Sequence, residues 1–62
     1  MKFKWQAIDK DGTIYRFTHK PYPNHILGIW DSDIKPNARL EKIGKIGRSS
    51  MPSDWTKSLT RI

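Results

Sequence analysis

The chain has to form a stable core from only 62 residues, and it contains no cysteine. A domain of about this size removes only about 60% of its unfolded surface from water, so its core is thin. Small chains often add disulfides or a structural metal, but disulfides are excluded here and two histidines are too few for a structural zinc site. The sequence therefore predicts one domain over residues 1–62, stabilised by aromatic packing or by a partner.

The aromatic side chains are the best source of such packing. The chain has three tryptophans, two tyrosines and two phenylalanines. Each of them buries roughly 150–250 Å² when it is packed. We expect the core to be built mainly from these residues, which are Phe3, Trp5, Tyr15, Phe17, Tyr22, Trp30 and Trp55.

The first third of the chain has the pattern of a β-hairpin. Residues 3–7 alternate apolar with polar side chains, as a strand with one buried face does. An Asp-Lys-Asp-Gly turn follows, in which Gly12 can take the left-handed conformation. Residues 13–18 then form the returning strand, and an in-register pairing sets Tyr15 and Phe17 beside the apolar side chains of the first strand.

The middle of the chain predicts two more strands after an interruption. Residues 20–24 contain two prolines, which lack an N–H and should stop the sheet. Residues 26–31 have the β-branched and aromatic content of a third strand. Residues 39–46 predict a fourth, and Gly44 and Gly47 favour a bulged or twisted strand there over a helix.

The C-terminal segment predicts a short helix. Ser53 suits the N-cap of a helix over residues 54–60, in which Trp55 and Leu59 share one face and can lie on the sheet. The fold class predicted is therefore α+β, a three- or four-stranded antiparallel β-meander with a short C-terminal helix. An all-β small barrel is the alternative.

No set of residues predicts a catalytic, metal or cofactor site. His19 and His25 are separated by the proline-rich segment, with no cysteine or carboxylate nearby to complete a metal site or a catalytic set. Asp9 and Asp11 resemble the start of a calcium loop, but the later ligands of such a loop are missing. Serines occur without a nucleophile motif, and no complete phosphate-binding loop is present. We expect no enzymatic activity and no cofactor.

Basic residues predict one candidate binding surface. The chain has twelve Lys and Arg against six Asp and Glu, which gives a net charge of +6. Five of the basic residues can contact phosphates if they project from one edge. Lysines on an edge strand also prevent unwanted pairing, so protection of the edge explains the same residues. The five are Lys35, Arg39, Lys42, Lys45 and Arg48.

Apolar residues predict a second candidate surface. A sheet covered on one side only has a second face that is polar or meets a partner. Tryptophan and tyrosine are also common anchors at interfaces. An apolar patch of this kind would bind a host protein or form a homodimer. The residues expected in it are Ile14, Tyr22, Leu27, Ile29 and Trp30.

The chain also carries features that bear on its location. Its longest apolar stretch, about residues 26–30, is far shorter than the roughly 20 residues of a membrane-spanning helix. The first residues alternate in polarity and do not form the apolar run of a signal peptide. The absence of cysteine agrees with a reducing compartment. We expect a soluble cytoplasmic protein with no membrane contact.

Several short motifs follow one another in order along nearly the whole chain. They are Trp5 with Asp9-Lys10-Asp11-Gly12, Tyr15 with Lys20-Pro21, Trp30, Ile43-Gly44-Lys45, and Pro52-Ser53-Asp54-Trp55-Thr56-Lys57-Ser58-Leu59. In this order they resemble small uncharacterised accessory proteins of tailed bacteriophages and prophages. The closing stretch, with its proline, tryptophan, basic residue, serine and leucine, is the most specific part of the resemblance.

The resemblance implies an accessory protein that acts in the cytoplasm of the bacterial host. Proteins of this size and kind often bind and redirect a host enzyme, nuclease or polymerase. The resemblance brings no catalytic residues with it. We therefore expect a non-enzymatic protein that binds and modulates a host or phage protein, and a nucleic-acid-binding module acting through residues 35–48 is the alternative.

Overall fold

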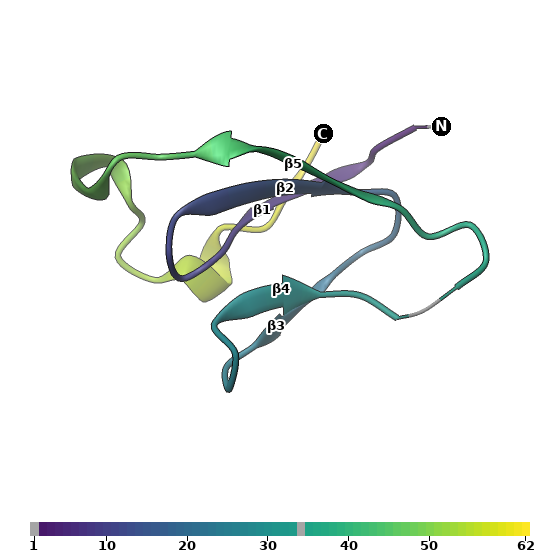
Figure 1. Ribbon diagram of the computed structural model, residues 1–62, viewed down its shortest axis with the longest axis horizontal. Helices are drawn as coiled ribbons and strands as arrows, with labels where there is room; N and C mark the ends of the chain where they lie inside the picture. The colour runs from purple at the N-terminus through teal and green to yellow at the C-terminus, as the bar shows by residue number, and fades with distance from the viewer. Residues whose placement is uncertain (1, 34) are drawn as a thin grey trace.

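A computed structural model describes residues 2–33 and 35–62 (Figure 1). Two short 3-10 turns, η1 (Arg48–Ser50) and η2 (Trp55–Lys57), follow the fifth strand. Within the described ranges, no helix has the length and apolar character needed to cross a membrane. The strands are β1 (Trp5–Ile8), β2 (Thr13–Phe17), β3 (Tyr22–Asn24), β4 (Ile29–Asp31), β5 (Leu40–Lys45) and β6 (Thr60–Arg61).

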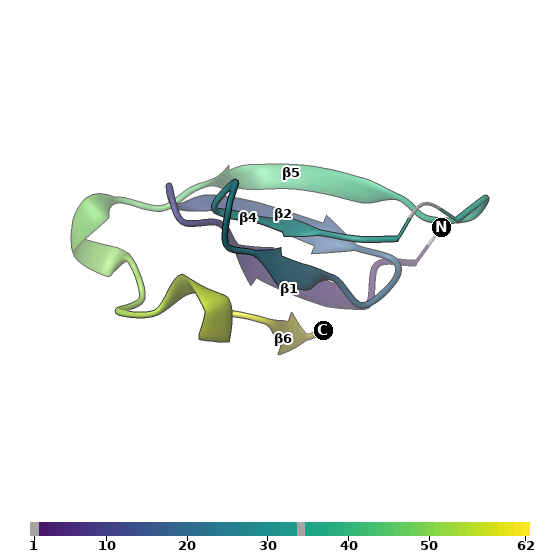
Figure 2. The same ribbon diagram turned by 90° about the horizontal axis from the view of Figure 1, so that it is seen from below.

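The strands form two antiparallel sheets. The larger sheet has the order β5-β2-β1-β6, and the smaller one consists of β3 and β4 alone. The β3–β4 hairpin lies against one face of the larger sheet (Figures 1 and 2). The prediction of an antiparallel β-sheet is confirmed. The barrel alternative is wrong, because the two sheets remain separate.

The first hairpin has the predicted register. Trp5 pairs with Phe17 and Ala7 pairs with Tyr15, so the apolar side chains of both strands lie on one face. The turn is closed by a bond from the Gly12 N–H to the Asp9 carbonyl oxygen, at 2.9 Å. The left-handed conformation expected at Gly12 is present, with φ at 93°.

The middle of the chain differs from the prediction. Only Ile29–Asp31 of the expected strand is extended, and β3 contains Pro23 in the segment expected to interrupt the sheet. Pro23 pairs with Trp30, whose own N–H is directed away from β3 and donates to the Asp9 carboxylate at 2.8 Å. Pro23 therefore occupies a position in the ladder where a missing N–H costs nothing.

The predicted meander is wrong for a related reason. The β3–β4 hairpin folds over the larger sheet and does not extend it. The next strand to pair with β2 is therefore β5. The bulged fourth strand is confirmed, because the β2–β5 register shifts between Ile14 and Tyr15.

The predicted C-terminal helix is also wrong. The chain makes only the three-residue turn η2 and then pairs β6 with β1. Ser58 ends the turn, because its hydroxyl accepts the N–H of Ile8 at 3.0 Å and donates to the Trp55 carbonyl oxygen at 2.7 Å. The expected contact with the core is confirmed, since Trp55 and Leu59 both pack against it.

The core is small and mainly aromatic, as the sequence predicts, but Phe3 and Tyr22 are not part of it, and Tyr22 is 47% exposed. Ala7, Phe17 and Trp30 are buried, and Trp5, Tyr15, Trp55 and Leu59 pack around them. The Trp30 and Trp55 rings meet edge to face with centroids 6.1 Å apart. Because the Trp30 indole N–H donates to the Ile8 carbonyl oxygen at 2.9 Å, this buried donor is satisfied.

The turn at Gly12 gives a test of this architecture. A Cβ at Gly12 would lie 3.2 Å from the Ile46 carbonyl oxygen and 3.3 Å from the Met51 sulfur, in a backbone conformation that alanine disfavours. We expect Gly12→Ala to lower the free energy of unfolding by about 1–2 kcal/mol in urea denaturation. Gly44→Ala is the control, because no atom lies within 4 Å of its Cβ, and it should change stability by less than about 0.5 kcal/mol. Equal losses in both variants would contradict this account of the turn.

Candidate functional site

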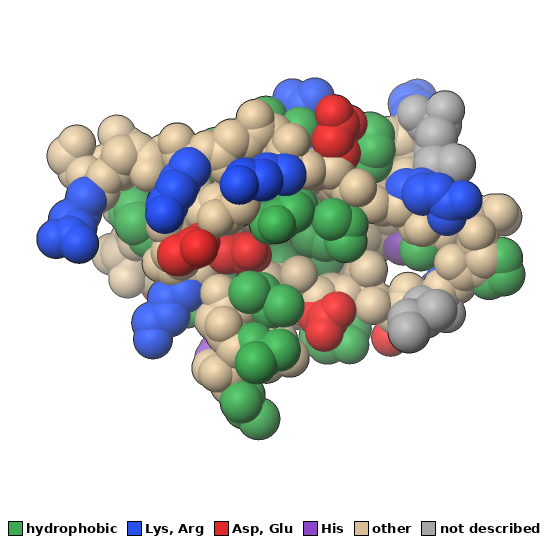
Figure 3. All heavy atoms as spheres, viewed as in Figure 1, with side chains coloured by type: hydrophobic (Ala, Val, Ile, Leu, Met, Phe, Trp, Pro, Cys, Tyr) green, Lys and Arg blue, Asp and Glu red, His purple; other side chains and the backbone are tan. Residues whose placement is uncertain are grey.

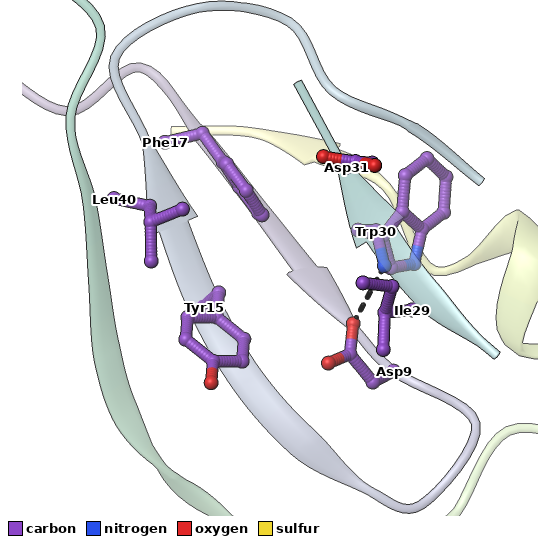
Figure 4. A pocket seen from close by; sticks show the side chains of 7 residues that line it. All are labelled: Asp9, Tyr15, Phe17, Ile29, Trp30, Asp31 and Leu40. Atoms are coloured by element: carbon purple, nitrogen blue, oxygen red, sulfur yellow. Dashed lines mark hydrogen bonds between the residues drawn. The ribbon is translucent and has the colours of Figure 1, made fainter. Parts of the chain in front are cut away.

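An apolar groove lies between the larger sheet and β4 (Figure 4). Its volume is about 180 Å³. Pockets for small organic ligands usually measure roughly 300–1,000 Å³, so this groove suits one or two side chains of a partner better than a free ligand. It is lined by Asp9, Tyr15, Phe17, Ile29, Trp30, Asp31 and Leu40.

The strand register explains why these residues meet. Leu40 of β5 stands opposite Phe17 of β2, so the two side chains lie on the same face of the sheet. Tyr15 lies two residues before Phe17 and therefore shares this face, and the centroids of their rings are 6.2 Å apart. Since the β3–β4 hairpin does not reach β5, Leu40 remains 55% exposed at the rim of the groove.

Asp9 holds the second wall of the groove in place. The residue is only 5% exposed, and its carboxylate accepts the backbone N–H of Trp30 at 2.8 Å. Burial raises the pKa of Asp9 above its usual value, the Trp30 hydrogen bond opposes this, and the negative charge of Asp11 adds to it. The carboxylate thus fixes β4 against the end of β1, with Ile29 beside the groove.

The turn between β3 and β4 presents two apolar side chains, Ile26 and Leu27, which we call the apolar turn. Ile26 is 96% exposed and Leu27 is 66% exposed. The Asn24 side chain accepts the N–H groups of both residues, at 3.1 and 3.0 Å, and the Asn24 carbonyl oxygen accepts the N–H of Gly28 at 2.8 Å. The turn is therefore held in one conformation by bonds within the hairpin.

The apolar turn and the groove form one surface. Ile29 directly follows the turn in sequence and lines the groove. Figure 3 shows hydrophobic side chains running from the hollow between the sheets to the projecting end of the hairpin. The Lys10 N–H donates to the Gly28 carbonyl oxygen at 3.0 Å, which ties the base of the turn to the first hairpin.

The candidate basic residues lie along β5 and beyond its two ends. Lys42 and Lys45 stand opposite Tyr15 and Thr13, which places both lysines on the face that carries the groove. Figure 3 shows Lys and Arg side chains in a row along this edge. Arg39 precedes the strand, and its guanidinium donates to the Ala38 carbonyl oxygen at 2.8 Å.

The other two basic candidates are farther from the groove. Lys35 lines a shallow hollow beside the loop that leads into β5, and Arg48 begins η1. Arg48 shares a second hollow with Lys10, Asp11 and Lys45. Hydrogen bonds from Thr13, with a smaller contribution from the charge of Lys45, lower the pKa of Asp11, so an acid group partly balances this end of the row.

The candidate apolar residues are not all brought together. Tyr22 and Leu27 are exposed on the β3–β4 hairpin, and Ile29 lines the groove. Ile14 lies on the opposite face of the larger sheet, because it alternates with Tyr15. Trp30 requires a correction, since it is only 5% exposed and belongs to the core.

Two residues of this surface, Ile26 and Leu40, are missing from the sequence-based set. Ile26 falls within residues 26–31, which the sequence predicts as a strand, although Asn24 and Gly28 bracket the segment as residues of a tight turn do. Leu40 lies within residues 39–46, which the sequence predicts only as a strand. Leu40 is exposed because the β3–β4 hairpin covers only part of the larger sheet, and no local sequence pattern indicates how far that hairpin extends.

The two histidines make local contacts outside this surface. The His19 ring nitrogen Nδ1 lies 2.9 Å from the Thr18 hydroxyl, and the His25 ring lies 5.9 Å from the Trp55 ring between centroids. Across residues 2–33 and 35–62, no three His, Cys, Asp or Glu side chains are grouped so as to hold a metal ion.

Comparison with protein-family models, curated proteins and solved structures gives no match for this chain. The chemistry of the surface is therefore the basis for a functional proposal. Its main features are the projecting apolar turn, the adjacent groove and the basic row along β5.

The buried Asp9 carboxylate gives a pH-dependent test. Because its pKa is raised in the folded state, its contribution to stability is fully present below about pH 3.8 and is lost as the pH rises through the folded pKa. Asp9→Asn keeps an oxygen acceptor for the Trp30 N–H and removes the buried charge. We expect this variant to be at least as stable as the wild type at pH 7 in urea denaturation, with the difference vanishing toward pH 3.

Asp9→Ala is the matched control, because it removes the acceptor and leaves the Trp30 N–H unpaired. It should lower the free energy of unfolding by about 1–3 kcal/mol over the whole pH range. A strong loss of stability in Asp9→Asn at pH 7 would show that the ionised carboxylate is required, and the account of its burial would then be wrong.

Proposed function

We propose that this chain is a non-enzymatic accessory protein that binds and modulates a host or phage protein in the bacterial cytoplasm. The observation that carries the proposal is the apolar turn. Two adjacent aliphatic side chains, Ile26 and Leu27, project into solvent from a turn whose backbone is fixed by Asn24. Single exposed aliphatic residues are common, but a projecting pair continuous with an apolar groove is typical of an interaction surface.

The rigidity of the turn favours binding. A loop that is already in its bound conformation loses little conformational entropy when a partner covers it. The adjacent groove supplies aromatic and aliphatic contacts from Tyr15, Ile29 and Leu40, above the buried ring of Phe17. Interfaces derive most of their affinity from a few buried apolar and aromatic anchors, and this surface offers such anchors in a continuous arrangement.

The proposal of a non-enzymatic role is supported by the use of the two carboxylates in the groove. Asp9 accepts the backbone N–H of Trp30, and Asp31 accepts the backbone N–H of Ser32 at 2.9 Å. Both groups thus hold the backbone of this region. The resemblance of the sequence to phage accessory proteins supports a partner of host or phage origin.

Removing the apolar turn gives a direct test. We expect the double variant Ile26→Ser, Leu27→Ser to retain at least tenfold less of its partner than the wild type, when proteins captured from bacterial lysate are quantified by mass spectrometry. Its stability should be unchanged, because both side chains are exposed. Ile62→Ser is the matched control, since it removes an exposed aliphatic side chain elsewhere and should leave capture intact. Equal capture by all three proteins would refute the proposal.

Nucleic-acid binding is the second candidate function, and the row of basic residues along β5 favours it. Lys42 and Lys45 lie on the same side of this strand. If they contact phosphates, short DNA should bind at about 50 mM salt and weaken by orders of magnitude at about 200 mM, as measured by tryptophan fluorescence.

The double variant Lys42→Ala, Lys45→Ala tests this alternative. It should lower the slope of log affinity against log salt by about two, because two phosphate contacts are lost. The apolar-turn variant should bind DNA as the wild type does. Absence of binding at the lower salt concentration would eliminate this candidate.

A further inference from the structure

The outer edge of β5 is free to pair with another strand. β5 is the outermost strand of the larger sheet, beyond β2 (Figure 2), and no described strand pairs with its other side. Just before β5, the Arg39 carbonyl oxygen accepts the Thr18 N–H at 3.0 Å, so the backbone of Arg39 is directed toward β2. Backbone groups alternate in direction along an antiparallel pair, so the N–H and C=O groups of Leu40 and Lys42 point outward.

The side chains along this edge alternate in the same way. Leu40 and Lys42 lie on the face that carries the groove, while Glu41 lies on the other face beside Arg16. A strand added beside β5 would therefore place alternate side chains over the groove, next to Leu40. This matches the general form of peptide recognition by strand addition, in which backbone bonds give affinity and pockets select alternate side chains.

The charge along the edge selects the kind of strand. Lys42 and Lys45 lie on the face of β5 that carries the groove, and Arg39 and Arg48 extend the positive charge beyond the two ends of this strand. Within β5 only Glu41 carries a negative charge, and outside it Asp31 and Asp33 share a hollow with Leu40, Lys35 and Arg39 at the start of the strand. Like charges opposite one another destabilise a pair of strands, and opposite charges stabilise it. Pairing of β5 with β5 of a second copy would place two strands of net positive charge side by side, so the charge favours a partner strand that is acidic.

We propose that β5 accepts an extended, acidic segment of the partner protein as an additional strand, with one apolar side chain of that segment over the groove beside Leu40. This inference rests on the proposed function and names the kind of partner segment. A nucleic acid could meet the positive charge, but its phosphates cannot donate to the outward C=O groups of Leu40 and Lys42. The lysines of β5 also discourage pairing with neutral or basic edge strands. The same lysines therefore exclude such strands and select an acidic one.

The test uses a defined peptide as the probe. An acetylated and amidated peptide of six alternating Glu and Leu residues has the length of β5. We expect it to shift the backbone amide signals of Leu40 and Lys42 in NMR spectra of the full chain, and to give a dissociation constant by titration. The same peptide with Lys in place of Glu should bind at least about tenfold more weakly, because the charges then repel.

Two changes separate backbone pairing from charge. Methylating the peptide nitrogens that face β5 should weaken binding about tenfold at unchanged charge. In the protein, Lys42→Ala should weaken binding about threefold through the lost charge. Lys42→Pro should weaken it about tenfold further, because it also removes the outward N–H. The methylated peptide tests the same bond in the wild-type protein, so the result does not depend on the folding of Lys42→Pro.

The outcomes distinguish this inference from the proposed function. Equal binding of the methylated peptide, or equal shifts at β5 produced by oligothymidylate of the same charge, would overturn strand addition and show attraction by charge alone. If the peptide fails to shift β5 while the apolar-turn variant loses its captured partner, the proposed function stands and this inference fails. If the peptide pairs with β5 while that variant keeps its partner, the apolar turn is not the anchor and the strand site remains.

Discussion

The hydrogen bond from the Trp30 backbone N–H to the Asp9 carboxylate joins the two sheets inside the core. Asp9 directly follows the first strand, and Trp30 is the central residue of β4 and part of the core. The indole N–H of Trp30 adds a second bond to the Ile8 carbonyl oxygen. In a core this small, the orientation of one tryptophan decides where the whole β3–β4 hairpin lies.

The groove exists because the two packed sheets differ in size. A two-stranded hairpin lies on a four-stranded sheet, and the joint at Asp9 fixes it toward the β1 side. The part of the larger sheet that is farthest from β1, around Leu40 and Tyr15, is only partly covered by the hairpin. The apolar turn and the groove are therefore consequences of the same position of the hairpin, which hydrogen bonds to the first hairpin hold in place.

Features that depend on neighbouring residues were predictable from the sequence, and features that depend on distant residues were not. Alternation gave the first hairpin and its aromatic face, and glycine content gave the bulge in β5. Pro23 can lie in a strand because the N–H of its partner Trp30 is bonded to the distant Asp9 carboxylate. The predicted C-terminal helix is absent because Ser58 is bonded to the distant Ile8. For the candidate surface, Leu27 and Ile29 were predictable from the sequence. The exposure of Leu40 was not, because it depends on how far the β3–β4 hairpin extends over the larger sheet.

The pairing of β6 with β1 joins residues that are almost the full length of the chain apart. Trp5 pairs with Arg61, whose guanidinium lies 5.1 Å from the Trp5 ring, and the Ile62 N–H donates to the Lys4 carbonyl oxygen at 2.9 Å. During synthesis, β1 and β2 can pair before residues 60–62 leave the ribosome, so one side of β1 stays open until those residues have emerged. The nascent chain therefore passes through a period in which an unpaired strand beside an aromatic core is accessible to other chains.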